Sequence, residues 1–330
     1  IFPPSEAEPN EADNDESSYS VDLDKLRLSN INISYTDLGA NTIANIDGLG
    51  LKAKGNVKDE LITGDINLTI DALRAMINDD TTNMDASAKN IVLNGKIKMT
   101  GDDINANVNL GTGALAFLMQ GDDNIMANLN SLGVNYNGDI YNYEHIKGNV
   151  NLIVDDATAL MDGDKYADNA DINLNIPLDF DLNQNYVKFE KSELKLNDIK
   201  VEFIGDAMLK DDIKLNMDLR TNTMIIDELI RLIPEKMRED LLSGIKVNGK
   251  LILDTHVEGT YSENLMPLIK ANVILADGYF EMPEELPYPI TGLNTALHTD
   301  LDLNGKSHVD IKSFRARMNN TILAANGSIR

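Results

Sequence analysis

A repeat of alternating segments constrains this chain more than any other sequence feature. Ile66-Asn67-Leu68 returns as Val108-Asn109-Leu110 and again as Val150-Asn151-Leu152, at intervals of 42 residues (108 − 66 and 150 − 108). In each copy apolar side chains alternate with Asn, Asp or Thr, which is typical of a strand with one apolar and one polar face. The regular interval predicts a unit of about 42 residues, repeated three times between residues 64 and 183.

Alternation of the same kind continues along the rest of the chain and predicts about twenty strands. Between Leu28 and Ile31 the apolar phase shifts by one residue, which predicts a β-bulge at Ser29-Asn30. Pro177 occupies a polar position within the longest alternating run. Because proline has no backbone N–H, it predicts an edge strand or an irregular pairing at that point.

One segment, near residues 227–243, departs from this rhythm and predicts a short helical region. Apolar side chains recur there every four residues, at Leu229, Ile233, Met237 and Leu241. Asp227 is the expected N-cap, and Pro234 predicts a break between two short helices. The predicted fold is therefore mainly β, an elongated, curled antiparallel sheet that is repeat-built and groove-like or taco-like, with one short kinked helical segment.

The composition excludes several classes of protein. The chain has 330 residues and a formal net charge of −25, which argues against a nucleic-acid partner and against broad adhesion to anionic lipid. It has no cysteine, so disulfides and thiol catalysis are excluded. No apolar run is long enough to span a bilayer. Residues 1–18 are acidic and predict a disordered linker; because they lack a signal-peptide pattern, we expect the chain to be the trimmed part of a longer protein.

The sequence predicts no enzyme, no metal site and no cofactor. It contains no nucleophile elbow, no phosphate-binding glycine-rich loop and no His-Glu-x-x-His motif. Asp162-Gly163-Asp164 lacks the closing glutamate of a calcium loop. Its four histidines share no ligand spacing and are expected to be solvated, at His145, His256, His298 and His308. Paired carboxylates are expected to follow turns, at Asp79-Asp80, Asp102-Asp103, Asp122-Asp123 and Asp155-Asp156.

The apolar face is the unusual feature, and two interpretations of it stay open. It is either the core of an ordinary β-sandwich or the lining of a groove that holds acyl chains. Burial of each methylene contributes roughly 0.8 kcal/mol, so a lipid needs few directional contacts there. The candidate groove residues are Ile66, Leu68, Ile70, Val108, Leu110, Val150, Leu152, Leu174, Ile176, Leu215, Met217 and Leu251.

The carboxy-terminal part, residues 196–330, carries a family resemblance. Its order runs from Ile226-Asp227-Glu228-Leu229 through Gly249-Lys250-Leu251 and Asp277-Gly278-Tyr279-Phe280 to Ile290-Thr291-Gly292-Leu293-Asn294. This order resembles the AsmA family of bacterial envelope proteins, in the form met in Bacteroidetes-type sequences, and over residues 19–195 the likeness is mainly one of strand pattern. The family is similar to the TamB and chorein bridge-type lipid-transfer proteins, and it provides no catalytic residue to carry over.

The resemblance implies a periplasmic β domain, residues 19–330, anchored to the inner membrane by an amino-terminal helix that this chain lacks. The function it implies is lipid binding or lipid transfer in outer-membrane homeostasis, with phospholipid or another acyl lipid as partner. The alternative hypothesis is a non-catalytic β-sandwich scaffold or assembly module that binds other envelope proteins.

Overall fold

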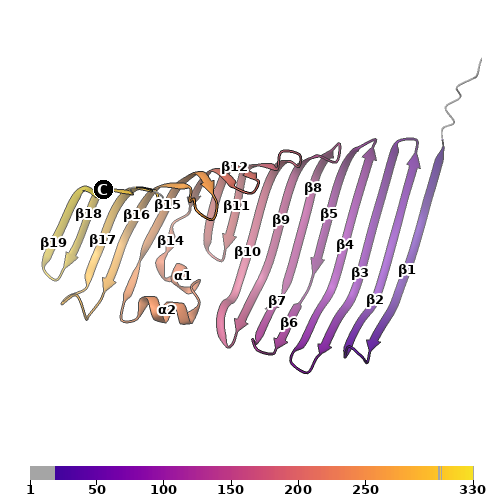
Figure 1. The fold of residues 1–330 in the computed structure, drawn as a ribbon, viewed down its shortest axis with the longest axis horizontal. Helices are drawn as coiled ribbons and strands as arrows, with labels where there is room; N and C mark the ends of the chain where they lie inside the picture. The colour runs from indigo at the N-terminus through magenta and orange to yellow at the C-terminus, as the bar shows by residue number, and fades with distance from the viewer. Residues whose placement is uncertain (1–18, 304, 306, 330) are drawn as a thin grey trace, which may run out of the picture.

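The structure is a computed structural model, which describes residues 19–329 except residues 304 and 306 (Figure 1). The predicted disordered linker, residues 1–18, lies outside the described residues. Of the described residues 75% lie in strands and 5% in helices, and the nineteen strands found there belong to one antiparallel sheet. The predicted mainly β fold, an elongated, curled antiparallel sheet of repeat-like architecture, is confirmed.

The elements follow one another along the chain as an antiparallel meander. The strands are β1 (Ser20–Asp37), β2 (Thr42–Lys58), β3 (Leu61–Asn78), β4 (Asn83–Thr100), β5 (Asp103–Thr112), β6 (Leu115–Gln120), β7 (Ile125–Leu129), β8 (Ser131–Tyr141), β9 (His145–Met161), β10 (Asp164–Asp181), β11 (Tyr186–Leu196), β12 (Ile199–Leu209), β13 (Ile213–Thr221), β14 (Met224–Ile225), β15 (Lys246–Tyr261), β16 (Leu268–Glu281), β17 (Ile290–Leu301), β18 (His308–Met318) and β19 (Thr321–Ile329). The helices are α1 (Ile226–Arg231) and α2 (Glu235–Leu242).

Most strands pair with their sequence neighbours, so the sheet extends from β1 at one end to β19 at the other (Figure 1). Two of the long strands are interrupted. β4 pairs with both β5 and β6, and β9 pairs with both β7 and β8, so four short strands take the place of two long ones.

The interval of 42 residues corresponds to one antiparallel hairpin of long strands. β3, β5 and β9 begin at Leu61, Asp103 and His145, which are 42 residues apart (103 − 61 and 145 − 103). Each repeated triplet therefore recurs on every second long strand, in the same orientation and on the same face of the sheet. This geometry explains why the apolar positions of the three copies line up across the sheet.

The sheet is a single layer with very little buried interior. The whole chain exposes 21787 Å² of surface, against about 13,500 Å² for a compact monomer of this mass. The buried apolar side chains are mostly small, for example Ala207 and Ala316. Extensive strand-to-strand contacts occur between neighbours in the sheet alone, so among the described residues no second sheet covers either face.

The helical segment forms as two helices, as Pro234 predicts, since Pro234 precedes the first residue of α2. The predicted N-cap is wrong: Ile225 caps α1, and Asp227 lies in its first turn. Figure 1 shows both helices below the short strands β11 and β12, where α1 contacts β15 and α2 contacts β10. They fill a notch along one side of the sheet and do not form a second layer.

Pro177 lies inside the sheet, in β10, which pairs with strands on both sides. On the β9 side it faces Asn149, and on the β11 side the register shifts between Asn175 and Leu178. The prediction of an irregular pairing is therefore confirmed, and the alternative of an edge strand is wrong. The side-chain oxygens of Asn149 and Asn175 are buried and have no hydrogen-bond partner among the described residues. The hydrogen bonding of the polar face is therefore incomplete beside Pro177.

A line of backbone irregularities, some of them β-bulges, crosses the long strands, and we call it the bulge seam. At it the backbone takes a left-handed conformation, with positive φ at Asn30, Gly48, Asn90, Asp156 and Asn169. The predicted bulge at Ser29-Asn30 is confirmed by the register shift between Leu28 and Ile31. Each bulge moves the alternation by one residue, so apolar side chains stay on the same face on both sides of the seam.

Hydrogen bonds from strand to strand support this seam. The backbone N–H of Asp156 donates to Asp171 Oδ1 at 3.0 Å, and the N–H of Asp171 donates to Asn197 Oδ1 at 2.8 Å. The Nδ2 amide of Asn130 donates to Asp156 Oδ2 at 2.6 Å. The expectation that Asp155-Asp156 follows a turn is therefore wrong, because both residues lie within β9. There Asp156 donates one of the seam's hydrogen bonds through its N–H and accepts another through Oδ2.

Candidate functional site

Apolar side chains form rows that run across the strands on one face of the sheet, which we call the apolar face. The longest, the leucine row, is made of directly paired residues on ten neighbouring strands, β1 to β5 and β8 to β12. These residues are Leu28, Leu51, Leu68, Leu93, Leu110, Val134, Leu152, Leu174, Leu194 and Val201. At about 4.8 Å between strands, the row extends for roughly 43 Å.

A second row lies one step along the strands, and we call it the valine row. It consists of Leu26, Ala53, Ile66, Gly95, Val108, Tyr136, Val150 and Ile176. The two rows are separated by two residues along each strand, or about 6.6 Å. Together they give the face a continuous aliphatic surface rather than a series of separate patches.

The structure brings most of the twelve predicted groove residues together. Four lie in the leucine row and four in the valine row, and Ile70 follows one step beyond, paired with Ile91. Met217 belongs to a third row that passes through Leu178, Phe189 and Gly205, and Leu215 lies beside it. Leu251 is on β15, paired with Met224 and Leu275. All twelve therefore lie on the apolar face, although the last three are several strands away from the others.

None of the twelve side chains is fully buried. Ile66 and Leu110 are 39% and 38% exposed, and the remaining ten are half-buried between their row neighbours. Residues of the same kind in a closed sandwich core would be covered by the opposing sheet. On this face the covering surface is absent among the described residues, so the rows are accessible to a ligand or a partner.

The apolar face is hollowed beyond the bulge seam. A shallow hollow of about 450 Å³ lies over β3, β4, β6, β7 and β9. Most of its apolar lining comes from Leu73, Ala86, Ala88, Leu115, Phe117, Ala127, Leu129, Ala157 and Ala159. The sequence did not point to these residues, because in the alternation along each strand they occupy the positions that correspond to the polar residues of the repeated triplets. The available signal in the sequence was the Asn and Asp residues that stand between the two phases, such as Asn90 and Asp156, which the structure places at positive φ.

One aromatic side chain, Tyr136, interrupts the aliphatic rows at mid-sheet. Gly138 and Gly148 face each other on β8 and β9, and Tyr136 lies across them. A Cβ atom on Gly148 would be 2.9 Å from Tyr136 Cε2 and 2.8 Å from the carbonyl oxygen of Asn137. Burial raises the pKa of the Tyr136 hydroxyl, which donates a long hydrogen bond of 3.4 Å to the carbonyl of Asp139.

The opposite face, which we call the polar face, carries side-chain amides and also ion pairs that join neighbouring strands. An asparagine row crosses six strands, at Asn67, Asn94, Asn109, Asn135, Asn151 and Asn175. Farther along, the side chains form ion pairs, such as Lys200 with Glu193 at 2.6 Å and Arg220 with Asp254 at 2.8 Å. The chemistry of the two faces therefore differs along the whole length of the sheet.

The four histidines occupy separate places on the sheet. His145 contacts Asp179, His298 lies near Asn272, and His308 lies near the carbonyl of Ile329. Among residues 19–329, apart from the two undescribed positions, no group of three or more potential ligands is arranged to hold a metal ion.

His256 has a charged environment and should give the protein a measurable pH dependence. Its ring lies 2.8 Å from Asp218 and 3.4 Å from Glu258, and the hydrogen bond that the ring donates to Asp218 is the main cause that raises the pKa of His256 above 6.5. The resulting stabilisation is complete below pH 6.5 and is lost as the pH rises through the raised pKa.

We expect His256→Gln to remove less than about 1 kcal/mol of unfolding free energy at pH 6, and progressively less towards pH 9. Urea unfolding of both proteins across this range measures the difference. A difference that does not change with pH would contradict the assignment.

Comparison with known proteins gives no match to a family model, a curated protein or a solved structure. Within the described residues, neither helix has the length and apolar character that crossing a membrane requires.

Proposed function

We propose that this protein binds acyl lipid along its apolar face and contributes to lipid transfer in the periplasm. The observation that supports this proposal best is the continuity of the leucine and valine rows, which present half-exposed aliphatic side chains on consecutive strands. An acyl chain needs apolar area and few directional contacts, and such a surface supplies them at roughly 0.8 kcal/mol per buried methylene.

The polar face supports the same proposal indirectly. Its amides and ion pairs keep most of one side of the sheet in water, so the rows on the other side are the larger surface for apolar ligands. An uncovered apolar surface of this extent is unfavourable in water and is typical of an interaction site. The location in the periplasm, with an inner-membrane anchor, rests on the resemblance to the AsmA family.

The first experiment extracts lipid from freshly purified protein and identifies it by mass spectrometry. We expect phospholipid to copurify with the protein. Protein stripped of lipid should also take up a fluorescent phospholipid, and its failure to do so would count directly against the proposal.

A second experiment identifies the face that binds. The chain contains no tryptophan, so a single tryptophan is a specific reporter. We expect brominated phosphatidylcholine to quench the fluorescence of Leu93→Trp, on the apolar face, and to leave Asn94→Trp, on the polar face, nearly unchanged. Equal quenching of the two neighbouring positions would show that lipid association is not specific to one face.

The alternative is a non-catalytic scaffold module whose apolar face is covered by another envelope protein. The single-layer sheet does not have the predicted sandwich form, but a partner protein can cover an open face as lipid can. Under this alternative, neither tryptophan variant responds to lipid.

A further inference from the structure

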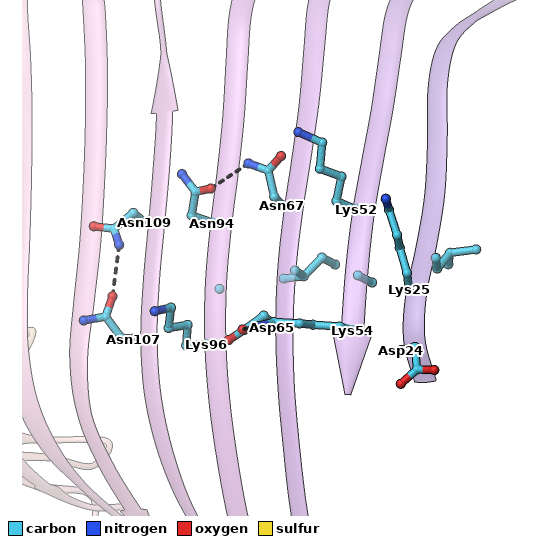
Figure 2. Close-up of a pocket in the computed structure, with 14 residues that line it drawn as sticks. Asp24, Lys25, Lys52, Lys54, Asp65, Asn67, Asn94, Lys96, Asn107 and Asn109 are labelled. Atoms are coloured by element: carbon cyan, nitrogen blue, oxygen red, sulfur yellow. Dashed lines mark hydrogen bonds and ion pairs between the residues drawn. The ribbon is translucent and has the colours of Figure 1, made fainter. Parts of the chain in front are cut away.

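A hollow on the polar face collects lysines in a chain that is otherwise strongly acidic. It has a volume of about 450 Å³, lies over β1 to β5, and is shown in Figure 2. Its charged side chains are those of Asp24, Lys25, Lys52, Lys54, Asp65 and Lys96. Four cations and two carboxylates give it a local charge of +2 (4 − 2), against −25 for the whole chain.

Two parallel rows of side chains form the walls of the hollow (Figure 2). One wall continues the asparagine row and contains Lys52, Asn67, Asn94 and Asn109. The other wall contains Lys54, Asp65, Lys96 and Asn107. Between them lies the backbone of Ala53, Ile66 and Gly95, whose side-chain positions belong to the apolar face. The hollow is thus a trough with a backbone floor and polar walls.

Among the described residues, one of the four lysines, Lys54, forms an ion pair with a carboxylate of the hollow, while Lys96 acts on the same carboxylate only through the weaker effect of its charge. Lys54 Nζ lies 2.9 Å from Asp65, and this hydrogen bond holds the pKa of Asp65 below its usual value. Among the described residues, no ion pair joins Lys25, Lys52 or Lys96 to a carboxylate at this distance. Like charges that line one hollow repel one another, and an anion between them would relieve the repulsion.

Amide donors are also available at the trough. Asn94 accepts a hydrogen bond of 2.6 Å from Asn67, and Asn107 accepts one of 3.0 Å from Asn109, both through Oδ1. Their Nδ2 groups make no hydrogen bond within the described residues and can donate to a ligand. In the sheet register Lys52 and Lys96 lie on different walls and two strands apart, within the combined span of two extended lysine side chains.

We propose that this trough is an anion site that takes the phosphate group of a soluble phosphate ester. Three ammonium groups and two amides offer more donors than one carboxylate can accept, and a phosphate group provides enough acceptor oxygens. A lipid headgroup is disfavoured because the surrounding polar face offers no surface for acyl chains. The site is independent of lipid binding, since the sheet separates the trough from the apolar face.

The test is a titration of the whole chain with inorganic phosphate and with pyrophosphate at constant ionic strength, by calorimetry. We expect saturable binding at one site. Lys52→Gln should weaken it by about tenfold, and the double variant Lys52→Gln/Lys96→Gln should abolish it. Lys214→Gln is the matched control and should bind as the unmodified chain does, because Lys214 is an exposed lysine on β13 that forms no ion pair with any described residue.

Two outcomes would overturn the proposal. Weak, unsaturable heats that are the same in the unmodified chain, the control and the double variant would indicate an adventitious ion only. The second outcome is that the unmodified chain binds phosphatidylglycerol vesicles but not phosphatidylcholine vesicles, and that the double variant loses this binding. The lysines would then bind a membrane surface instead. Thermal melting of each variant verifies that the sheet is intact.

Discussion

Replacing Leu152 by aspartate is expected to lower the amount of bound lipid at least tenfold while the chain stays folded. Leu152 lies at the middle of the leucine row, between Val134 and Leu174, and is half-buried. A carboxylate there would have to be desolvated under an acyl chain, which costs several kcal/mol. Without lipid the same carboxylate faces water, so we expect a loss of only about 1–2 kcal/mol of stability.

The measurement compares phospholipid per protein after extraction and the midpoint of urea unfolding. Asn151→Asp is the matched control, because it adds the same charge one residue away on the polar face. We expect it to retain lipid. Should Leu152→Asp fail to fold, Leu110→Asp provides a second variant, at a side chain that is already 38% exposed.

The opposite result would support a closed apolar core. If Leu152→Asp and Leu110→Asp both unfold the chain and Asn151→Asp does not, then the apolar face is covered in solution, and the scaffold alternative becomes the better explanation. If all three variants keep their lipid, the bound lipid does not lie on the leucine row.

Gly148→Val is expected to cause the largest loss of stability, about 2–3 kcal/mol. The new Cβ would lie 2.8 Å from the carbonyl oxygen of Asn137 and 2.9 Å from Gly138 Cα. These contacts are with backbone atoms, which cannot rotate away as a flexible side chain can. The Tyr136 ring, which crosses this pair of glycines, would also be displaced.

Gly111→Val is the control for this substitution. Gly111 is also a strand glycine, on β5, but no atom lies within 4 Å of the Cβ that a substitution would add. We expect its unfolding free energy to stay within about 0.5 kcal/mol of that of the unmodified chain. Urea unfolding measures both variants, and equal losses would contradict the steric explanation.

The sequence predicts the faces of the sheet well because alternation is a local property. Leu68 and Asn67 must point to opposite sides of any strand that contains them, so each repeat already assigns its apolar and polar residues. The bulge at Asn30 and the helix break at Pro234 were predictable for the same reason, since each changes the local geometry of the backbone. The N-cap at Asp227 was wrong because the end of a helix depends on its tertiary packing.

The hollow beyond the bulge seam and the lysine trough were not predictable. Phe117 and Ala159 line one hollow, and Lys52 and Lys96 lie on opposite walls of the other, only because the strands pair in a particular register. Residues that far apart in sequence carry no local signal of their proximity. Asp155-Asp156 was assigned to a turn for a related reason, because its partners at the seam come from neighbouring strands.

The sequence by itself therefore determined a repeated strand with one apolar and one polar side. It did not determine what lies over the apolar side, because the same alternation is compatible with a sandwich core and with an open surface. The tertiary structure decided this by pairing every strand edge to edge in one sheet. Strand pairing uses backbone hydrogen bonds, so the sheet can extend one strand at a time. Among the described residues no second layer covers it, and its aliphatic rows stay accessible.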